Sequence, residues 1–413
     1  MIASPPLSRP QALFDFAGSG TIDPRLTFTR ASNATRINRF GYIETVPSGI
    51  PRMDYNPITG AIRGILIEQQ STNLLLQSED FISPWASVNS AIEASTVIPP
   101  SGTGTAKKLK ESLANAGHFV YQSANCTSGI QYTFSVYAKA GERKKIFLSV
   151  HPTTLATAFQ ANQAVFDLET GLVSGVVGCI ASMSINANGF YRCSWTATAT
   201  ATNSSNFNIY LANNSSLVTY QGDNVSGVYL YGGQLEVGSK ATSYIKTTTA
   251  QVTRAADSLS LQSSAFTRAI NANEGAIYID YEINQSAWPA SSPVIACLSN
   301  GSGTGEASGI ILSASNAGLY LDATVSSASQ AALNVAAGTT SGEHRAAFSY
   351  KTDGFSLSAD NATPATDSSG SIPSLTRFDI GSVIGTRHFN GHIKRIAAFP
   401  RYADSTIIQS ITQ

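Results

Sequence analysis

Two carboxylates on one short strand are the first residues that could do chemistry. Asp280 and Glu282 alternate with apolar residues in the segment 275–283, so both side chains share one face of a predicted strand. Paired carboxylates cleave glycosidic bonds. However, this face is also the expected solvent face, and the glycine-rich segment 301–305, GSGTG, does not join a strand to a helix as a nucleophile elbow would. We therefore predict no catalytic residues and a protein that is not an enzyme.

Histidines and cysteines give no metal or redox motif. His388 and His392 have a helical i, i+4 spacing, but Asn390 and Gly391 break any helix, so we expect a turn with solvated imidazoles. A Cys179–Cys193 bridge is an alternative that the two-residue turn predicted at Asn188-Gly189 disfavours. We expect reduced, buried thiols at all four cysteines, which are Cys126, Cys179, Cys193 and Cys297.

Aromatic and lysine side chains are the candidates for carbohydrate binding. We predict that Tyr137 and Phe147 share an outer face of a hairpin, because a three-residue loop at 141–143 places Val136 opposite Leu148 in the core. Aromatic faces stack on sugars and lysines donate to hydroxyls. The alternative is a cross-strand aromatic pair covered by the N-terminal arm or by a neighbouring subunit. The full set of candidates is Tyr137, Phe147, Lys139, Lys145, Tyr229, Tyr231 and Trp288.

The composition indicates a neutral polar surface. Charged residues make up 13% of the 413 residues, about half the ~25% of an ordinary globular protein, and the net charge is zero. We therefore expect no nucleic-acid binding. The N-terminus has no apolar stretch typical of a signal peptide, and no run is long enough to cross a membrane, so we expect synthesis in the cytoplasm of a host without membrane insertion.

Hydrophobic periodicity predicts an all-β protein. An extended N-terminal arm at 1–72 is followed by two antiparallel β-sandwich (jelly-roll) domains at 73–250 and 268–413, with an ordered linker at 251–267. The stretch 231–257 should form an ordered ribbon between them. We also predict a core position for Trp195, a hairpin about Asp353-Gly354, and a short C-terminal helix capped by Asp404.

Three stretches resemble known families. The segment TFTRASNATRINRFGYIETV with the following PRMDYNPITGAIRGILIEQQSTNLLLQSEDF resembles the N-terminal region of tailed-bacteriophage tail and fibre proteins. NLLLQSEDFISPW with DNVSGVYLYGGQLEVGSKATSYI resembles carbohydrate-binding modules of the jelly-roll type. EHRAAFSYKTDGFSLSADN with FNGHIKRIAAFPR resembles concanavalin A-like (laminin-G-like) lectin domains.

These resemblances imply a site and a function. The jelly-roll modules imply a structural calcium held by Asp223 together with Glu79 and Asp80, and the alternative is that Asp223 only makes a turn. Together the resemblances imply a phage virion protein, a tail fibre or receptor-binding subunit, located at the particle surface. It would bind a bacterial surface glycan without catalysis, contact other tail proteins through its arm, and form a homo-oligomer, with a trimer favoured. The alternatives are a structural baseplate or capsid-decoration protein and a glycan depolymerase.

Overall fold

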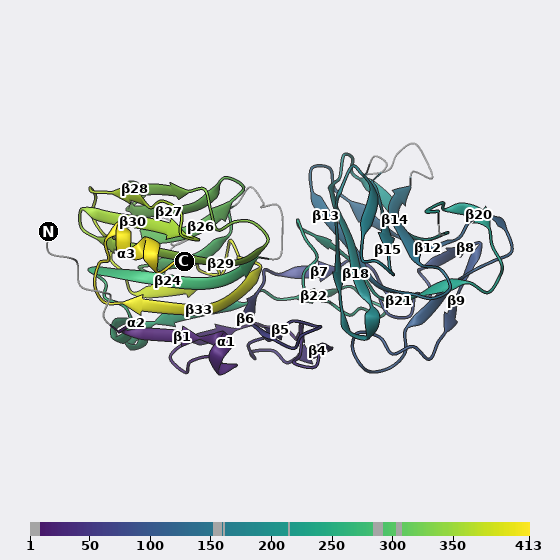
Figure 1. Cartoon of the computed structure of the whole chain (residues 1–413), viewed down its shortest axis with the longest axis horizontal. Helices are drawn as coiled ribbons and strands as arrows, with labels where there is room; N and C mark the ends of the chain where they lie inside the picture. The colour runs from purple at the N-terminus through teal and green to yellow at the C-terminus, as the bar shows by residue number, and fades with distance from the viewer. Residues whose placement is uncertain (1–8, 152–158, 160–161, 214, 284–291, 303–307) are drawn as a thin grey trace.

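The chain folds into two β-sandwiches that lie side by side (Figure 1). The computed structural model describes residues 9–413 except 152–158, 160–161, 214, 284–291 and 303–307. The predicted all-β class is confirmed, because strands predominate among the described residues and the few helices are short. None of the described helices has the length and apolar character needed to cross a membrane.

The first sandwich packs two six-stranded antiparallel sheets on each other. Its core contains Trp195, Phe134 and Phe207, which confirms the buried position predicted for Trp195. In order across one sheet the strands are β17 (Ile180–Ile185), β18 (Tyr191–Thr198), β13 (Gln131–Ala140), β21 (Gly227–Val237), β10 (Lys107–Glu111) and β9 (Ser90–Ala94). Across the facing sheet they are β16 (Val173–Val177), β15 (Gln163–Asp167), β14 (Lys145–His151), β19 (Asn203–Ala212), β12 (Phe119–Cys126) and β8 (Ala86–Val88). A separate pair is β11 (Asn115–Gly117) with β20 (Thr219–Gln221).

The hairpin predicted between β13 and β14 is wrong. β13 pairs with β18 and β21, whereas β14 pairs with β15 and β19, so the chain crosses from one sheet to the other between them. Val136 and Leu148 both lie in the core of the sandwich, but they enter it from opposite sheets. Tyr137 and Phe147 consequently lie on opposite outer surfaces of the sandwich. Alternation of apolar residues determines which face is buried and does not determine which sheet a strand joins.

The second sandwich is built from both ends of the chain. As predicted, Ile277, Ile279, Tyr281 and Ile283 of one strand face its core. The strands of one sheet, in order, are β31 (Ala365–Asp367), β30 (Gly354–Ala359), β29 (Gly342–Lys351), β24 (Glu274–Ile283), β33 (Gly391–Phe399), β6 (Ile62–Ile67) and β5 (Met53–Tyr55), and β1 (Ala12–Asp15) also pairs with β33. Those of the facing sheet are β2 (Thr27–Thr29), β23 (Ser258–Gln262), β32 (Arg377–Ile380), β25 (Val294–Ser299), β26 (Gly309–Ser315), β27 (Gly318–Val325) and β28 (Ala328–Val335).

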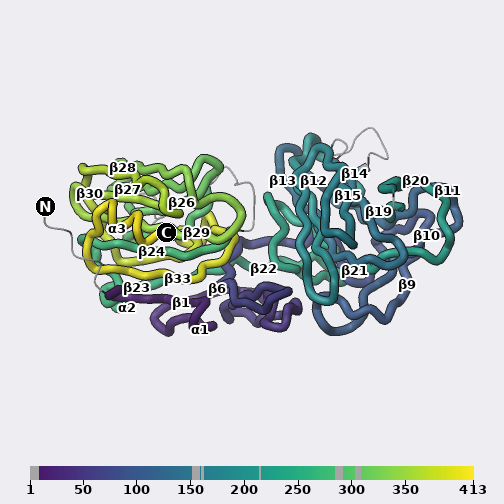
Figure 2. The backbone as a smooth tube through the Cα atoms, in the orientation of Figure 1, coloured from purple at the N-terminus to yellow at the C-terminus, as the bar shows by residue number. Residues whose placement is uncertain are grey.

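The extended arm expected at residues 1–72 is not what the structure shows. β1 and β6 both pair with β33, and β2 pairs with β23, so this segment supplies strands to both sheets of the second sandwich. In Figure 2 the purple N-terminal tube runs along the second sandwich and then reaches the gap between the two units. These strands are only three to six residues long, which is too short for periodicity alone to assign them. The first sandwich is thus an insertion between two parts of the second.

The joint between the sandwiches is ordered. β7 (Ser71–Asn73) pairs with β22 (Val252–Arg254), so the outgoing and returning chains form a small two-stranded ribbon. A second ribbon, β3 (Ala34–Ile37) with β4 (Ile43–Val46), lies beside it. The stretch 231–257 is held by backbone and side-chain hydrogen bonds along its length, as the sequence predicted for an ordered ribbon. The expected linker at 251–267 carries β22, β23 and the start of α2 (Ser263–Ala269).

The local turn and cap signals of the sequence agree with the structure at two places and differ from it at one. Asp404 accepts a hydrogen bond from the Ile407 amide at the start of α3 (Ser405–Ser410), as predicted. The β29–β30 hairpin is present, with Lys351 opposite Gly354. The two-residue turn predicted at Asn188-Gly189 is instead a single 3₁₀ turn, η1 (Ala187–Gly189), which places Cys193 opposite Met183. Among the described residues a third short helix, α1 (Phe16–Ser19), follows β1.

Candidate functional site: the cleft between the two sandwiches

A cleft of about 920 Å³ lies where the two sandwiches and the joint meet. One wall is the outer face of β17 and β18, and the opposite wall comes from the second sandwich at Glu282, Ser341 and His392. The floor comes from β3, β5, β6 and residues 239–244. A cavity of this size accommodates a ligand as large as a short oligosaccharide.

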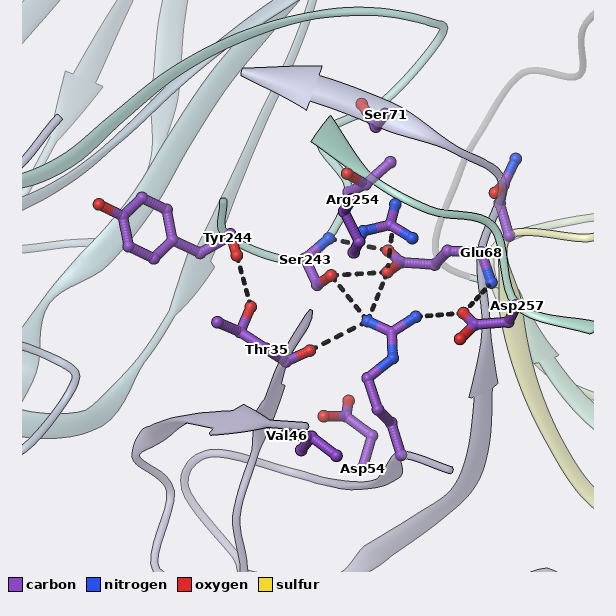
Figure 3. Close-up of polar contacts among 12 residues, drawn as sticks. Thr35, Val46, Asp54, Glu68, Ser71, Ser243, Tyr244, Arg254 and Asp257 are labelled. Atoms are coloured by element: carbon purple, nitrogen blue, oxygen red, sulfur yellow. Dashed lines mark hydrogen bonds and ion pairs between the residues drawn. The ribbon is translucent and has the colours of Figure 1, made fainter. Parts of the chain in front are cut away.

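Arg52 is the centre of a buried ionic cluster. Figure 3 labels its partners Thr35, Glu68, Ser243 and Asp257. Arg52 precedes β5, and its side chain is fully buried. Its guanidinium donates to the Thr35 carbonyl at 3.0 Å, to the Glu68 carboxylate at 2.8 Å and to the Ser243 hydroxyl at 2.8 Å. It also donates to Asp257. One side chain therefore ties the N-terminal segment to the ribbon that leaves the first sandwich and to the start of the second.

Two buried carboxylates balance this charge. Glu68, at the end of β6, accepts from the backbone amide and the hydroxyl of Ser243 at 2.8 and 2.6 Å. Burial alone would raise the pKa of Glu68, but the Arg254 and Arg52 guanidiniums hold it well below its usual range. Asp257 accepts from Arg30 at 3.2 Å and from the Glu68 amide at 2.9 Å. Glu68 is therefore fixed as an anion, and Asp257 is held in place by two donors.

Arg254 differs from the other arginines of the cluster. Its side chain is 1% exposed and lies 3.5 Å from Glu68. In contrast to Arg52, none of its three guanidinium nitrogens has a hydrogen-bond partner among the described residues. Arg254 is thus held in the cluster mainly by charge, whereas Arg52 is held by directed hydrogen bonds.

A second ionic chain forms the wall of the second sandwich. Arg63 makes a bidentate pair with Glu282, with nitrogen–oxygen distances of 3.0 and 2.6 Å. Asp54 accepts from His392 Nε2 at 2.8 Å and from the Ile37 amide at 2.6 Å. Burial lowers the pKa of His392, so its imidazole is neutral at pH 7. These carboxylates are acceptors held in fixed positions.

Two cations of the cleft make their hydrogen bonds to neutral groups. Arg192 of β18 donates to the Thr242 carbonyl at 2.6 Å and lies over the ring of Tyr137, with 5.2 Å between the guanidinium carbon and the ring centroid. Lys240 donates to the Asn390 carbonyl, and burial lowers its pKa to about 8. Arg192 and Lys240 therefore add hydrogen-bond donors to the cleft, held in place by these contacts.

The remaining lining is rich in hydroxyl and amide groups. Serines 182, 184 and 194 and Thr196 present hydroxyls from β17 and β18, and the amide of Asn56 comes from the other side. Ile58, Ile180 and Ile185 add apolar patches that are about half exposed. Hydroxyls and amides can both donate and accept. The arrangement suits a neutral polar ligand with many hydroxyls and some apolar surface.

The predicted carbohydrate-binding residues are not brought together. Tyr137 is 3% exposed and packs edge-on against Tyr231 and Tyr244, although it borders the cleft beneath Arg192. Phe147 lies on the facing sheet, where it is buried against Tyr210 of the neighbouring strand β19. Both rings are covered, but they do not form the cross-strand pair considered as the alternative, because β13 and β14 belong to different sheets.

The other members of that set are scattered. Lys139 donates to the Asn188 carbonyl at 2.6 Å, and Lys145 lies 3.7 Å from Asp167. The Tyr231 hydroxyl donates to Glu79 at 2.7 Å, and Tyr229 is half-buried beside the same aromatic cluster. Trp288 lies outside the described residues.

The three carboxylates considered for calcium are engaged separately. Asp223 accepts from the amide and hydroxyl of Ser226 at 2.7 and 2.6 Å, which makes the turn considered as the alternative. Glu79 accepts from Tyr231 and Lys246, and Asp80 pairs with Lys107 at 3.1 Å. In the described part of the chain, no three histidine, cysteine or acidic side chains are grouped so as to hold a metal ion.

The two carboxylates considered for catalysis, Asp280 and Glu282, line different hollows. Glu282 lines the cleft, whereas Asp280 lines a different hollow with His344 and Asp360, where burial raises the pKa of Asp280. The expected turn with solvated imidazoles is wrong, because His388 and His392 are 7% and 1% exposed and bond to Asp257 and Asp54. The four cysteines are free thiols, and all but the half-buried Cys179 are buried.

The ionic cluster is the feature that sequence reasoning missed. A single arginine or acid in a polar segment is most often solvated. One signal was available, since Glu68 directly follows the apolar run of β6 and Arg254 and Asp257 lie in the ordered ribbon. Their partner Arg52 is 205 positions away from Asp257, and no local pattern joins them.

Comparisons with known proteins give only distant structural similarity. No protein-family model matches the sequence, and no curated protein matches it. The carbohydrate-binding module CBM40 of the Ruminococcus gnavus IT-sialidase, bound to α2,3-sialyllactose, is 14% identical with a TM-score of 0.28 and covers 35% of this chain and 84% of its own. The Trypanosoma rangeli sialidase with 2,3-difluorosialic acid is 10% identical with a TM-score of 0.28, covering 79% and 62%. Mouse laminin α1 domains LG4-5 are 8% identical with a TM-score of 0.23, covering 76% and 98%.

These similarities leave the function to be argued from the chain itself. The chain spans 62% of the length of the trypanosomal sialidase. The three identities are all below 15% and the three TM-scores are all below 0.5, so no ligand or activity is inferred from them.

Proposed function

We propose that this protein binds a glycan without catalysis, and that the cleft between the two sandwiches is its binding site. The observation that carries the proposal is the lining of that cleft. Hydroxyl and amide groups from both sandwiches surround a space of about 920 Å³, and apolar isoleucines lie among them. A sugar presents the complementary surface, with hydroxyls at its edges and C–H groups on its faces.

Binding without catalysis is supported by the state of the carboxylates. Glycosidases need a protonated acid and a free carboxylate on either side of one bond. In the cleft, Glu282 is paired with Arg63, Asp54 with His392, and Glu68 with Arg52. Each is committed to a neighbouring cation or imidazole, so these groups serve as hydrogen-bond acceptors in the proposed site.

The biological setting that we propose is a bacteriophage particle. The N-terminal sequence resembles phage tail and fibre proteins, and the low charge suits a neutral surface glycan. Weak binding at each cleft becomes effectively irreversible when several copies act on one cell surface. The protein would then be a tail fibre or receptor-binding subunit that attaches the particle to its host.

The proposal is tested by cell binding with a cleft-filling variant. Labelled protein is added to candidate host cells before and after mild periodate oxidation of surface sugars. Ser341 is exposed and lines the cleft, so Ser341→Trp should fill it without disturbing a core. The matched control is Ser329→Trp at an exposed position on β28.

We expect periodate and Ser341→Trp each to abolish binding, while Ser329→Trp binds as wild type. Binding that survives periodate would reject a glycan receptor. Binding that is lost with periodate but unaffected by Ser341→Trp would place the site elsewhere on the surface.

A further inference from the structure

Two neighbouring edge strands lie on one flank of the first sandwich. β17 ends one six-stranded sheet and β16 ends the facing sheet, and the chain passes directly from one strand to the other. Within the described residues, β17 pairs only with β18 and β16 pairs only with β15. The outer backbone groups of both strands are therefore available for hydrogen bonding.

This flank is apolar and carries no charge. Residues 171–186 contain no aspartate, glutamate, lysine, arginine or histidine. Large apolar side chains are exposed along it, and they are Leu172 at 66%, Val176 at 46%, Val177 at 47%, Ile180 at 45% and Ile185 at 43%. Natural proteins protect free edges with charges, prolines or short strands. β17 has none of these features, whereas the pairing of β16 with β15 is interrupted by a β-bulge between Gln163 and Val165.

Several other edge strands in the described chain are charged, short or covered. β9, at the far side of the same sheet, carries Glu93 in a salt bridge with Lys110. β8, β2, β5 and β31 are three residues long. β28 is longer, but Ser371 donates to its Gln330 from a segment lying alongside, and its apolar side chains face the core. The flank formed by β16 and β17 is thus distinctive.

A second copy of this chain fits the flank best. A strand without charges meets no like charge when it pairs with itself, and its neutral polar and apolar side chains match their own copies. Antiparallel pairing of identical strands has two-fold symmetry and closes after two copies. A partner with a charged edge would instead bury unpaired charges against these apolar side chains.

The available area is compatible with a specific dimer. The six residues of β17 make an edge about 20 Å long. The two facing sheets are about 10 Å apart, so the flank is about 25 Å wide once the outer side chains are included. The contact would then bury about 500 Å² per copy, or about 1,000 Å² in total, which is the lower limit for a specific interface. Dissociation in the micromolar range is expected for such a contact.

We propose that β17 pairs antiparallel with β17 of a second copy, making one continuous sheet across a homodimer. Ser182 and Ser184 of β17 line the cleft, so the two clefts open on the same face of the joined sheet. Two binding sites on one face could engage a repeating ligand simultaneously. The two-fold contact predicts an even number of copies, in contrast to the trimer implied by the family resemblance.

The test is a mass measurement of the full chain over a range of concentrations. Light scattering or sedimentation of wild type should move from one to two copies of the 43.4-kDa chain as concentration rises through the micromolar range. Ile180→Lys with Ile185→Lys should raise the dissociation constant by about 100-fold or more, because four positive charges would enter an otherwise uncharged contact. Ser329→Lys with Ala332→Lys on β28 adds the same charge at exposed sites and should leave the dimer unchanged.

Amide hydrogen exchange gives an independent readout in unmodified protein. Residues 180–185 should exchange more slowly at high than at low protein concentration, while β9 should not change. A wild type that stays monomeric at high concentration, a trimer, or a dimer that tolerates the lysines on β17 would each overturn the proposal. Failure of glycan binding would leave it intact, since dimerisation is measured without ligand.

Discussion

Replacing Arg52 should destabilise the second sandwich far more than replacing Arg254. Both side chains are buried in one ionic cluster and both lie near Glu68. Arg52 donates hydrogen bonds to Thr35, Glu68, Ser243 and Asp257, whereas Arg254 has none among the described residues. Methionine keeps much of the volume and removes the charge in each case.

The magnitude follows from what each replacement leaves behind. Arg52→Met leaves Glu68 and Asp257 buried with fewer donors, and breaking a buried pair in this way costs about 3–5 kcal/mol. In this variant Glu68 still accepts a hydrogen bond from the Ser243 amide, and Asp257 still accepts one from Arg30. These remaining donors favour the lower end of the range of destabilisation. Arg254→Met loses an ion pair but also releases a buried charge without hydrogen bonds, so the net cost should stay within about 1 kcal/mol.

Calorimetry is the suitable assay, because it follows the unfolding of both sandwiches, whereas Trp85 and Trp195 report only on the first. For a unit of about 150–250 residues, 1 kcal/mol shifts the Tm by about 2–4 °C. We expect the transition of the second sandwich to fall by about 6–20 °C in Arg52→Met and by less than about 4 °C in Arg254→Met. Equal shifts in the two variants would refute the reasoning that directed hydrogen bonds, rather than charge alone, hold the cluster together.

Three further predictions concern other parts of the fold. Gly64→Ala should cost at least about 2 kcal/mol more than Gly49→Ala in urea unfolding. Both glycines have positive φ angles. However, a Cβ at Gly64 would lie 2.3 Å from the Ile393 carbonyl oxygen, whereas a Cβ at Gly49 would meet no atom within 4 Å. Similar losses of unfolding free energy in the two variants would argue against close pairing of β6 with β33. Wild-type stability should fall as pH drops below about 6.5, because burial lowers the folded-state pKa of His392 and the unfolded chain binds the extra proton. The difference between the Tm values at pH 7.5 and 5.5 should be smaller in His392→Gln than in wild type. An unchanged difference would show that protonation of His392 does not cause the loss of stability at low pH. Arg143→Met should lower the Tm of the first sandwich and cost about 2–3 kcal/mol of unfolding free energy, because it leaves the buried Glu111 without its bidentate partner. A variant as stable as wild type would show that the Tyr220 hydroxyl and the Asp223 amide alone satisfy the Glu111 carboxylate.

The sequence was most informative where one segment determines its own structure. The alternation in β24, the β29–β30 hairpin and the Asp404 cap each depend on a few neighbouring residues, and each is present. The core position of Trp195 followed from the same alternation. Such features are local, so a single sequence contains their full signal.

Long-range pairing was the part that the sequence did not reveal. β13 and β14 alternate as predicted, yet they join different sheets, and this separated Tyr137 from Phe147. Arg52 and Asp257 meet only because the first sandwich is inserted between two parts of the second. The cleft residues come from at least four distant segments, so their juxtaposition could not be read from spacing.

The most direct test of the proposed function is calorimetric titration of a host surface oligosaccharide into wild type and Ser341→Trp in parallel. The account predicts saturable binding to wild type, with the Ser341→Trp signal reduced to that of buffer and the Ser329→Trp signal unchanged. Equal binding by wild type and Ser341→Trp would contradict the assignment of the site to the cleft between the sandwiches.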